Sequence, residues 1–183
     1  MATVFIGGSR HVRVLDEDIR ARLDRIIRER LPILIGDADG ADKAVQGYLH
    51  ARGYPCVEVF CVGGRCRNNV GGWPSRAVSS HRRRKDFQYY ATKDRLMARE
   101  AAEGFMIWDG RSAGTLANVA RLARQGKPVT VYLVSTRQSV RLANETEWGQ
   151  FLGTCPPAVR ARAEEYVRAE EDEPANRPEP TLF

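Results

Sequence analysis

Short apolar runs alternate along this chain with longer stretches of helical spacing, and this alternation constrains the fold more than any other feature. Between the runs, apolar side chains recur every three or four positions, as Ile19, Leu23 and Ile26 do. Strands that alternate with helices of this length form right-handed β–α–β units. The sequence therefore predicts an α/β fold with a mainly parallel, five-stranded sheet and flanking helices. The predicted strands are residues 3–6, 32–35, 57–60, 105–108 and 129–134.

The remaining segments are less regular. A long loop rich in Gly and Arg occupies residues 62–84 and precedes a helix expected at residues 86–103. The pattern weakens after residue 135, and one further helix is expected at residues 157–171. With 183 residues and 43% apolar content, the chain has enough apolar surface for one core. We therefore expect a doubly wound, Rossmann-like domain at 1–136, a helical extension at 137–171 packed on the same domain, and a disordered acidic, Pro-rich tail at 172–183.

Charge and cysteine usage limit the partners and the compartment. The net charge is +6, and the acidic residues concentrate after residue 163, so the preceding chain is basic. A basic body binds anions, from a nucleotide phosphate to a nucleic acid backbone. No apolar run is long enough to cross a membrane, and the N-terminus lacks the features of a signal peptide. The four cysteines do not form the spacing of a disulfide framework. We expect a cytoplasmic protein with no membrane partner.

Two glycine-bearing loops follow predicted strands and lead toward helices. In an open parallel sheet, ligands bind outside the carboxyl ends of the strands. Glycine lets the backbone approach a phosphate, and the first N–H groups of a helix favour an anion. Neither loop matches a Walker or a Gly-x-Gly-x-x-Gly motif. The candidate phosphate-binding residues are Gly7, Gly8, Ser9 and Arg10 in the first loop, and Asp109, Gly110, Arg111, Ser112, Gly114 and Thr115 in the second.

The loop after the second predicted strand is acidic. Acids at a helix start are usually caps, with Asp39 expected as the N-cap and Asp42 three positions later. The functional alternative is that Asp37 or Asp39 binds a ribose hydroxyl, and the two roles are compatible. The candidate ligand-binding residues of this loop are Gly36, Asp37, Asp39, Gly40 and Asp42.

The three loops, in this order, resemble the signatures of the YspA-like branch of the SLOG superfamily, which also contains DprA and the Lonely Guy phosphoribohydrolases. The resemblance covers residues 3–134. It implies a Rossmann-like sheet that binds a nucleotide or nucleotide derivative without a further cofactor, and a homo-oligomer. Relatives carry an Arg-Asn-x-x-Met stretch before the fourth strand, and here Lys93, Asp94 and Met97 stand in the corresponding stretch. The residues that the resemblance places near the phosphate are Ser9, Arg10, Gly110, Ser112, Gly114 and Thr115.

The resemblance leaves the catalytic residue open. In the Lonely Guy enzymes, a glutamate follows the glycine loop and is catalytic, whereas Asn118 occupies that position here. An amide cannot act as a general acid or base, and cleavage of an N-glycosidic bond needs a carboxylate. The candidate catalytic carboxylates are Asp37, Asp39, Asp94 and Asp109. The chain is thus expected to be a nucleotide sensor or an N-glycosidic-bond hydrolase.

Three further features have an ordinary interpretation and a functional one. Cys61 and Cys66, with His81, have loose spacing for a zinc site and are expected to be structural or free thiols. Trp73 is expected to pack, although it could stack on a base. The basic run at residues 81–85 is expected to be a solvated approach to a helix. It could instead contact ligand phosphates or a nucleic acid backbone, so the alternative function is a DNA- or RNA-associated module.

Overall fold

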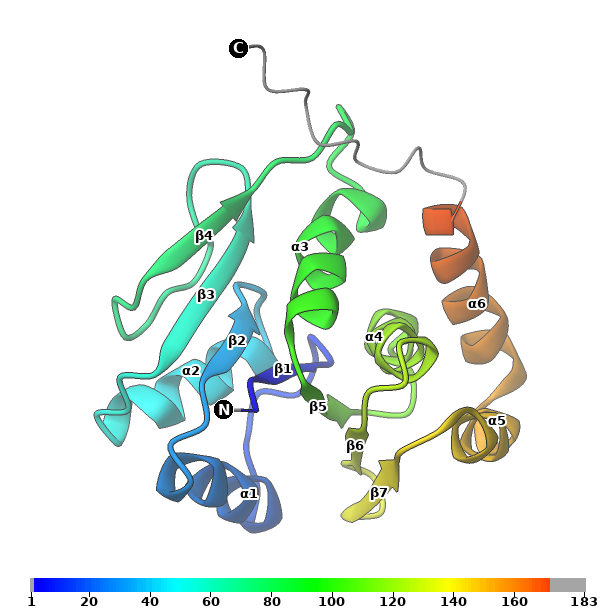
Figure 1. Cartoon of the computed structure of the whole chain (residues 1–183), viewed down its shortest axis with the longest axis horizontal. Helices are drawn as coiled ribbons and strands as arrows, with labels where there is room; N and C mark the ends of the chain where they lie inside the picture. Colours follow the sequence, from blue (N-terminus) through cyan, green and yellow to red (C-terminus); the bar gives the residue numbers. More distant parts are fainter. Residues whose placement is uncertain (1, 172–183) are drawn as a thin grey trace.

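The computed structural model describes residues 2–171, and within this range seven strands form a single sheet flanked by helices (Figure 1). The strands are β1 (Val4–Gly8), β2 (Ile33–Gly36), β3 (Val57–Val62), β4 (Ser75–Val78), β5 (Glu103–Trp108), β6 (Val129–Leu133) and β7 (Gln138–Leu142). The helices are α1 (Glu17–Arg28), α2 (Ala41–Ala51), α3 (Phe87–Glu100), α4 (Ala113–Arg124), α5 (Glu145–Thr154) and α6 (Pro157–Glu171).

The sheet is doubly wound about its central pair of strands. Its order is β4-β3-β2-β1-β5-β6-β7, and all neighbours are parallel except β6 and β7. The chain proceeds outward from β1 to β4 on one side, and then returns to place β5 against the other side of β1. This confirms the predicted Rossmann-like α/β fold. It also places a topological switch point between β1 and β5, where ligands bind in sheets of this kind.

Successive residues of the central strand serve two separate cores, because side chains of a strand alternate between its faces. Val4 and Ile6 pack with apolar residues of α1 and α2, whereas Phe5 packs with those of α3 and α4. The helices α5 and α6 extend the second core beyond α4, and Figure 1 shows α3, α4 and α6 side by side. Both faces of the sheet are therefore covered, which explains the continuous apolar runs in the sequence.

The start of each of three helices is fixed by a side chain that the sequence provides. Asp16 accepts a hydrogen bond from the Ile19 N–H at 3.0 Å, and Asp86 accepts one from the Tyr89 N–H at 3.0 Å. Ser112 caps α4 in the same way. Each cap satisfies an N–H group that has no acceptor within its helix.

The prediction of five strands was wrong, because two edge strands carry no apolar run. β4 lies inside the segment expected to be a loop, and its side chains are exposed or half-buried. β7 pairs antiparallel with β6, and four of its five residues are not fully buried. The helix α5 was also missed, since Phe151 is its one fully buried residue. The helix expected at residues 86–103 ends earlier, at Glu100, because Glu103 begins β5.

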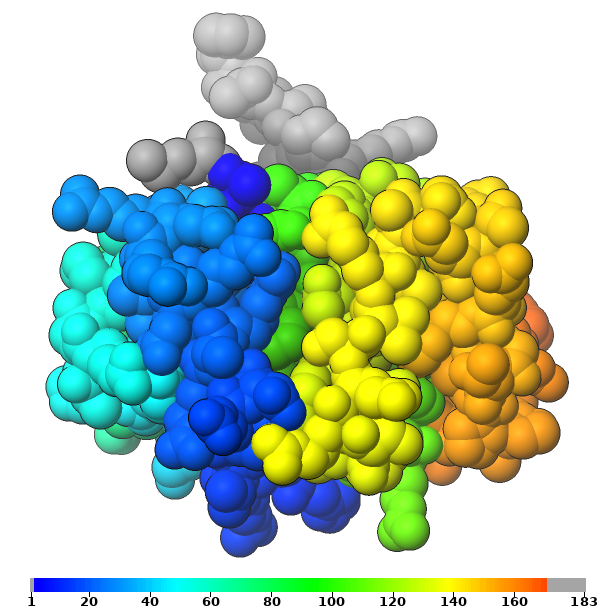
Figure 2. Space-filling view, turned by 90° about the horizontal axis from the view of Figure 1, so that it is seen from below, coloured from blue at the N-terminus to red at the C-terminus, as the bar shows by residue number. Residues whose placement is uncertain are grey.

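The far end of β6 is tied to α1. The Tyr132 hydroxyl donates to Asp16 at 2.6 Å, and Arg137 pairs with Asp18 at 3.1 Å. Figure 2 shows α1 beside the segment that contains β7 on this face of the molecule. The expected helix at residues 157–171 is confirmed as α6, which packs on α4. The tail expected at 172–183 lies outside the described residues.

One cysteine pair forms a disulfide, although the cysteine spacing did not predict a disulfide framework. Cys61 and Cys66 form a disulfide, because the turn after β3 brings their Cα atoms to 5.1 Å. Cys56 and Cys155 are free thiols. Within residues 2–171, none of the helices is both long and apolar enough to span a membrane.

Close packing at the end of β1 generates a test of the fold. A Cβ atom at Gly8 would lie 2.5 Å from the Ile107 carbonyl oxygen and 2.6 Å from the Ala41 Cβ. We expect Gly8→Ala to lower the free energy of unfolding by about 1–3 kcal/mol, because neither neighbour is a flexible side-chain end. Urea unfolding measures this loss.

Gly47→Ala is the matched control, since a Cβ there meets nothing within 4 Å and the residue lies inside α2. This variant should gain about 0.5–1 kcal/mol from its higher helix propensity. Equal effects of the two substitutions would contradict the packing described for β1.

Candidate functional site

A cavity of about 490 Å³ opens at the carboxyl ends of β1, β2 and β5. It lies at the switch point of the sheet, and parts of all three predicted loops line it. The wall from the first loop contains Gly7, Gly8 and Arg10. The second loop contributes Ala38 and Asp42, and the third contributes residues 111–115. The topology therefore brings together loops that are about a hundred residues apart in the sequence.

The end of the cavity near α4 has the chemistry of an anion site. Ala113 and Gly114 lie in the first turn of α4, where N–H groups have no acceptor within the helix. Both residues line the cavity. A Cβ at Gly114 would lie 2.9 Å from the Phe87 ring, so glycine allows the close approach between α4 and α3. The backbone of the first turn of α4 therefore faces the cavity and also packs closely against α3.

Asp109 shapes the loop before α4. One carboxylate oxygen accepts the Arg111 N–H and the Ser112 N–H, both at 2.9 Å, and it also accepts the Ser9 hydroxyl at 3.0 Å. Gly110 occupies the left-handed region with φ +80°, which glycine tolerates best. Asp109 thus holds the loop that carries the anion site, and it lies outside the main cavity.

Ser9 links the first and third loops instead of lining the main cavity. Its buried hydroxyl lies 3.3 Å from the Thr115 hydroxyl and accepts the Asp109 N–H at 3.1 Å. Thr115 in turn lines the cavity. Ser9 therefore fixes the distance between the ends of β1 and β5.

Two exposed arginines flank the mouth. Arg10 and Arg111 both line the cavity, and both also border a neighbouring hollow that contains His11 and Asp109. They come from the first and third loops, on either side of the switch point. Guanidinium groups in this position can bind a phosphate in bidentate fashion.

The floor of the cavity contains a buried ion pair. Lys93 is 4% exposed, and its ammonium donates to Asp94 at 2.6 Å. Asn118 donates to the second oxygen of Asp94 at 3.4 Å. Arg121 donates to Asn118 and pairs with Glu170 of α6, with 3.0 Å between the Arg121 Nε and a Glu170 carboxylate oxygen. A continuous polar chain therefore runs from the floor to the last described helix.

The ionisation states of Lys93 and Asp94 follow from the charges of their neighbours. Burial alone would lower the pKa of Lys93, but the carboxylates of Asp94 and Asp42 hold it above its ordinary value. Burial alone would raise the pKa of Asp94, but Lys93 and Arg121 hold it below its ordinary value. Lys93 is therefore a cation and Asp94 an anion at neutral pH.

Asp42 is the second carboxyl group at the floor. It is 7% exposed, and it accepts the Ala38 N–H at 3.2 Å. Burial raises its pKa to about 7, and the neighbouring Asp94 adds to this effect while Lys93 opposes it. A Cβ at Gly36 would lie 2.5 Å from Asp42 and 2.9 Å from the Lys93 ammonium, so only glycine leaves room for both groups. Sequence reasoning treated Asp42 as a capping or ligand-binding residue and missed its unusual pKa.

Asp37 forms an ion pair with Arg67, a residue that the sequence did not single out. Arg67 donates to it through its backbone N–H at 3.0 Å and through its guanidinium at 2.7 and 3.1 Å. Burial raises the pKa of Asp37, but these hydrogen bonds hold it below the ordinary value. Arg67 also stacks over Tyr90 at 4.4 Å and lines the cavity. No sequence signal distinguishes Arg67 from the other arginines of its loop.

The expectation that Asp39 is the N-cap of α2 was wrong. The N-cap is Gly40, which has φ +81° and no side-chain cap. A Cβ at Gly40 would lie 2.1 Å from the Arg10 carbonyl oxygen, so the two loops pack too closely for another residue. Asp39 instead accepts a hydrogen bond from Asn68 at 3.1 Å, and with Gly40 it borders a separate hollow beside Arg13 and Lys43.

An aromatic wall completes the cavity opposite the sheet. Phe87 of α3 stacks on Tyr166 of α6, with ring centroids 3.6 Å apart, and Tyr90 lies in the same wall. None of these three aromatic residues was predicted from the sequence to line the site. Tyr166 was not recognised, because the return of α6 across α4 leaves no local pattern.

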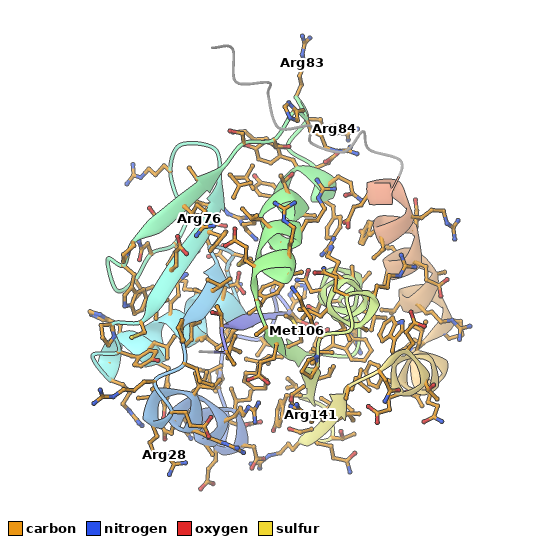
Figure 3. All side chains as sticks on the ribbon, in the orientation of Figure 1. Arg28, Arg76, Arg83, Arg84, Met106 and Arg141 are labelled. Atoms are coloured by element: carbon orange, nitrogen blue, oxygen red, sulfur yellow. A yellow bond between two sulfur atoms is a disulfide. The ribbon has the colours of Figure 1, made fainter. Side chains whose placement is uncertain are left out.

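The basic run before α3 is divided between two environments. Lys85 lines the cavity, and Arg82 forms an ion pair with Asp86 at 3.8 Å. Arg83 and Arg84 are exposed and lie at the end of the molecule near the start of α3 (Figure 3). Among residues 2–171, no group of three or more His, Cys, Asp or Glu side chains is arranged to hold a metal ion. Comparison with protein-family models, with curated proteins and with solved structures finds no match to this chain.

The raised pKa of Asp42 predicts a pH-dependent stability. Its folded value of about 7 exceeds its ordinary value of 3.8, so its contribution is complete at low pH and declines as the pH rises toward 7. Asp42→Asn removes this decline. Relative to the wild type, the free energy of unfolding of the variant should increase by on the order of 2 kcal/mol between about pH 5 and about pH 8. Denaturant unfolding across this range measures the change.

Asp94→Asn provides a control of opposite sign. The lowered pKa of Asp94 stabilises the fold above its ordinary value, and this contribution is lost as the pH falls. The variant should be less stable than the wild type at neutral pH, and the difference should shrink on acidification. Parallel pH profiles for the two variants would contradict the assigned charges.

Proposed function

We propose that this protein binds a nucleotide or a nucleotide derivative in the cavity at the switch point. The observation that carries the proposal is the arrangement of three chemistries around one space: an anion site, a buried polar floor and an aromatic wall. A volume of about 490 Å³ falls within the range of small-molecule sites, roughly 300–1,000 Å³. A ligand with a phosphate, a polar middle and a flat ring satisfies all three.

Each region has a role in this proposal. The phosphate binds at the first turn of α4, where Ala113 and Gly114 present N–H groups and Arg10 and Arg111 supply charge. Asp42 and Lys93 face the sugar and the bond that joins it to the base. The base lies toward the aromatic wall that Tyr90 and Tyr166 help to form. The positive charge at the mouth attracts an anionic ligand before contact.

The resemblance to the YspA-like branch of the SLOG superfamily is compatible with this proposal, and it leaves two forms of the function. The protein is either a sensor or a hydrolase of an N-glycosidic bond. Asn118 removes the carboxylate of the Lonely Guy enzymes, but the Asp94 carboxylate lies 3.4 Å from its amide. A carboxylate therefore remains near the family position.

A role in binding DNA or RNA receives less support. Of the basic run, Lys85 lines the cavity and Arg82 pairs with Asp86. Arg83 and Arg84 remain as an exposed pair, which is a small footprint for a nucleic acid backbone. A steep salt dependence of oligonucleotide binding would favour this alternative. The homo-oligomer that the resemblance implies is a separate proposal, and sedimentation that finds only monomer would contradict it.

A thermal-shift screen tests nucleotide binding. We expect a selective increase in Tm with one ligand among AMP, cyclic dinucleotides, NAD and ADP-ribose, because a ligand at about 100 times its Kd adds about 2.7 kcal/mol. Arg10→Ala should reduce the shift. Ser112→Asp should abolish it, since aspartate still caps α4 but repels a phosphate.

Arg28→Ala is the matched control. Arg28 is exposed on α1 and does not line the cavity, and Figure 3 shows it at the opposite end of the molecule from Arg83 and Arg84. Its loss should therefore leave the shift unchanged. A panel without any shift in the wild type would overturn the proposed function.

A further inference from the structure

We propose that Asp42 is the acid–base residue of a nucleotide N-glycosidic-bond hydrolase, and that it exchanges a proton with the departing base at the floor of the cavity. This inference rests on the proposed function, and it decides between the sensor and the enzyme. The sequence offered four other aspartates as candidates and singled out none of them.

Each of the other candidate carboxylates either is held by hydrogen bonds from a cation or lies outside the main cavity. Asp37 accepts three hydrogen bonds from Arg67. Asp109 holds the backbone of the loop before α4 and lies outside the main cavity, and Asp39 borders a different hollow. Asp94 is bound by Lys93 and Asn118. A carboxylate fixed by a cation has a stable charge, which suits it to orient its neighbours rather than to carry a proton.

Asp42 differs because its charge is not balanced by a dedicated cation. Lys93, the cation that acts on it from α3, donates its hydrogen bond to Asp94. Asp94 and Asp37 add negative charge on either side, and Arg67 attracts Asp42 while remaining bonded to Asp37. Asp42 and Asp94 thus share the single ammonium of Lys93. Because two nearby negative charges repel, one of the two carboxyl groups binds a proton more readily than an isolated aspartate does. Arg121 favours the ionised form of Asp94, so Asp42 is the carboxyl group of the pair that binds a proton more readily.

The position of Asp42 suits transfer to a bound ligand. The residue lines the same cavity as the α4 anion site. The Ala38 N–H holds one carboxyl oxygen at 3.2 Å, and the absence of a side chain at Gly36 leaves the space that the group occupies. A phosphate bound at α4 therefore anchors a nucleotide in the cavity whose floor contains the Asp42 carboxyl group.

The reaction balances with water as the second reactant. The bond between the anomeric carbon and the base nitrogen breaks with its electron pair on nitrogen, and Asp42 donates its proton to that nitrogen. Water adds to the anomeric carbon and gives up one proton to the Asp42 carboxylate, which restores the starting state. The products are the free base and the sugar phosphate.

The test separates binding from turnover. The wild type and Asp42→Asn are incubated with AMP, GMP, CMP and UMP, nucleotide binding is measured by calorimetry, and the released base by chromatography. The asparagine matches the shape of a protonated aspartate. We therefore expect binding at about pH 6 within about threefold of the wild type, with base release reduced by at least about 100-fold. Asp18→Asn, an exposed change on α1, is the matched control and should retain full activity.

A second measurement does not depend on the folding of a variant. Base release by the wild type should fall as the pH rises through about 7, because the acid form of Asp42 is the active one. Base release that Asp42→Asn leaves intact overturns the assignment of Asp42. Nucleotide binding without any base release overturns this inference and leaves the proposed function standing, whereas no binding overturns both.

Discussion

The buried ammonium of Lys93 connects the parts of the molecule on which the site depends. It belongs to α3, it is bonded to Asp94, and its charge also acts on Asp42 of α2. Asp94 continues the chain through Asn118 and Arg121 to Glu170 of α6. Because an unpaired charge in the interior is costly, each member constrains the position of the next. Four helices from distant parts of the chain, α2, α3, α4 and α6, are thereby held around one cavity.

The topology supplies the other half of this arrangement. Ser9 joins the ends of β1 and β5, and Asp109 orders the loop that begins α4. These contacts are polar and partly buried, and they involve none of the charged residues of the floor. The cavity thus has one end formed by the backbone at the start of α4 and a floor formed by closely spaced charged groups.

Sequence reasoning identified the fold and the loops because their signals are local. Apolar runs mark strands buried on both faces, and Asp16, Asp86 and Ser112 mark helix starts. The edge strands β4 and β7 lack such runs and could not be recognised. In the site, the pairing of Arg67 with Asp37 and the arrival of Tyr166 depend on tertiary packing, which no spacing encodes. The raised pKa of Asp42 is likewise a sum over neighbours from several elements.

The wall formed by α6 gives the site an order of assembly. The three glycine-bearing loops are encoded by residue 115, but Tyr166 and Glu170 are encoded near the end of the described chain. During synthesis, the sheet and the anion site can therefore form while the cavity still lacks its outer wall and the last partner of its polar chain. The cavity becomes complete only after α6 has left the ribosome, so a protein assembled in sequence order closes this cavity last.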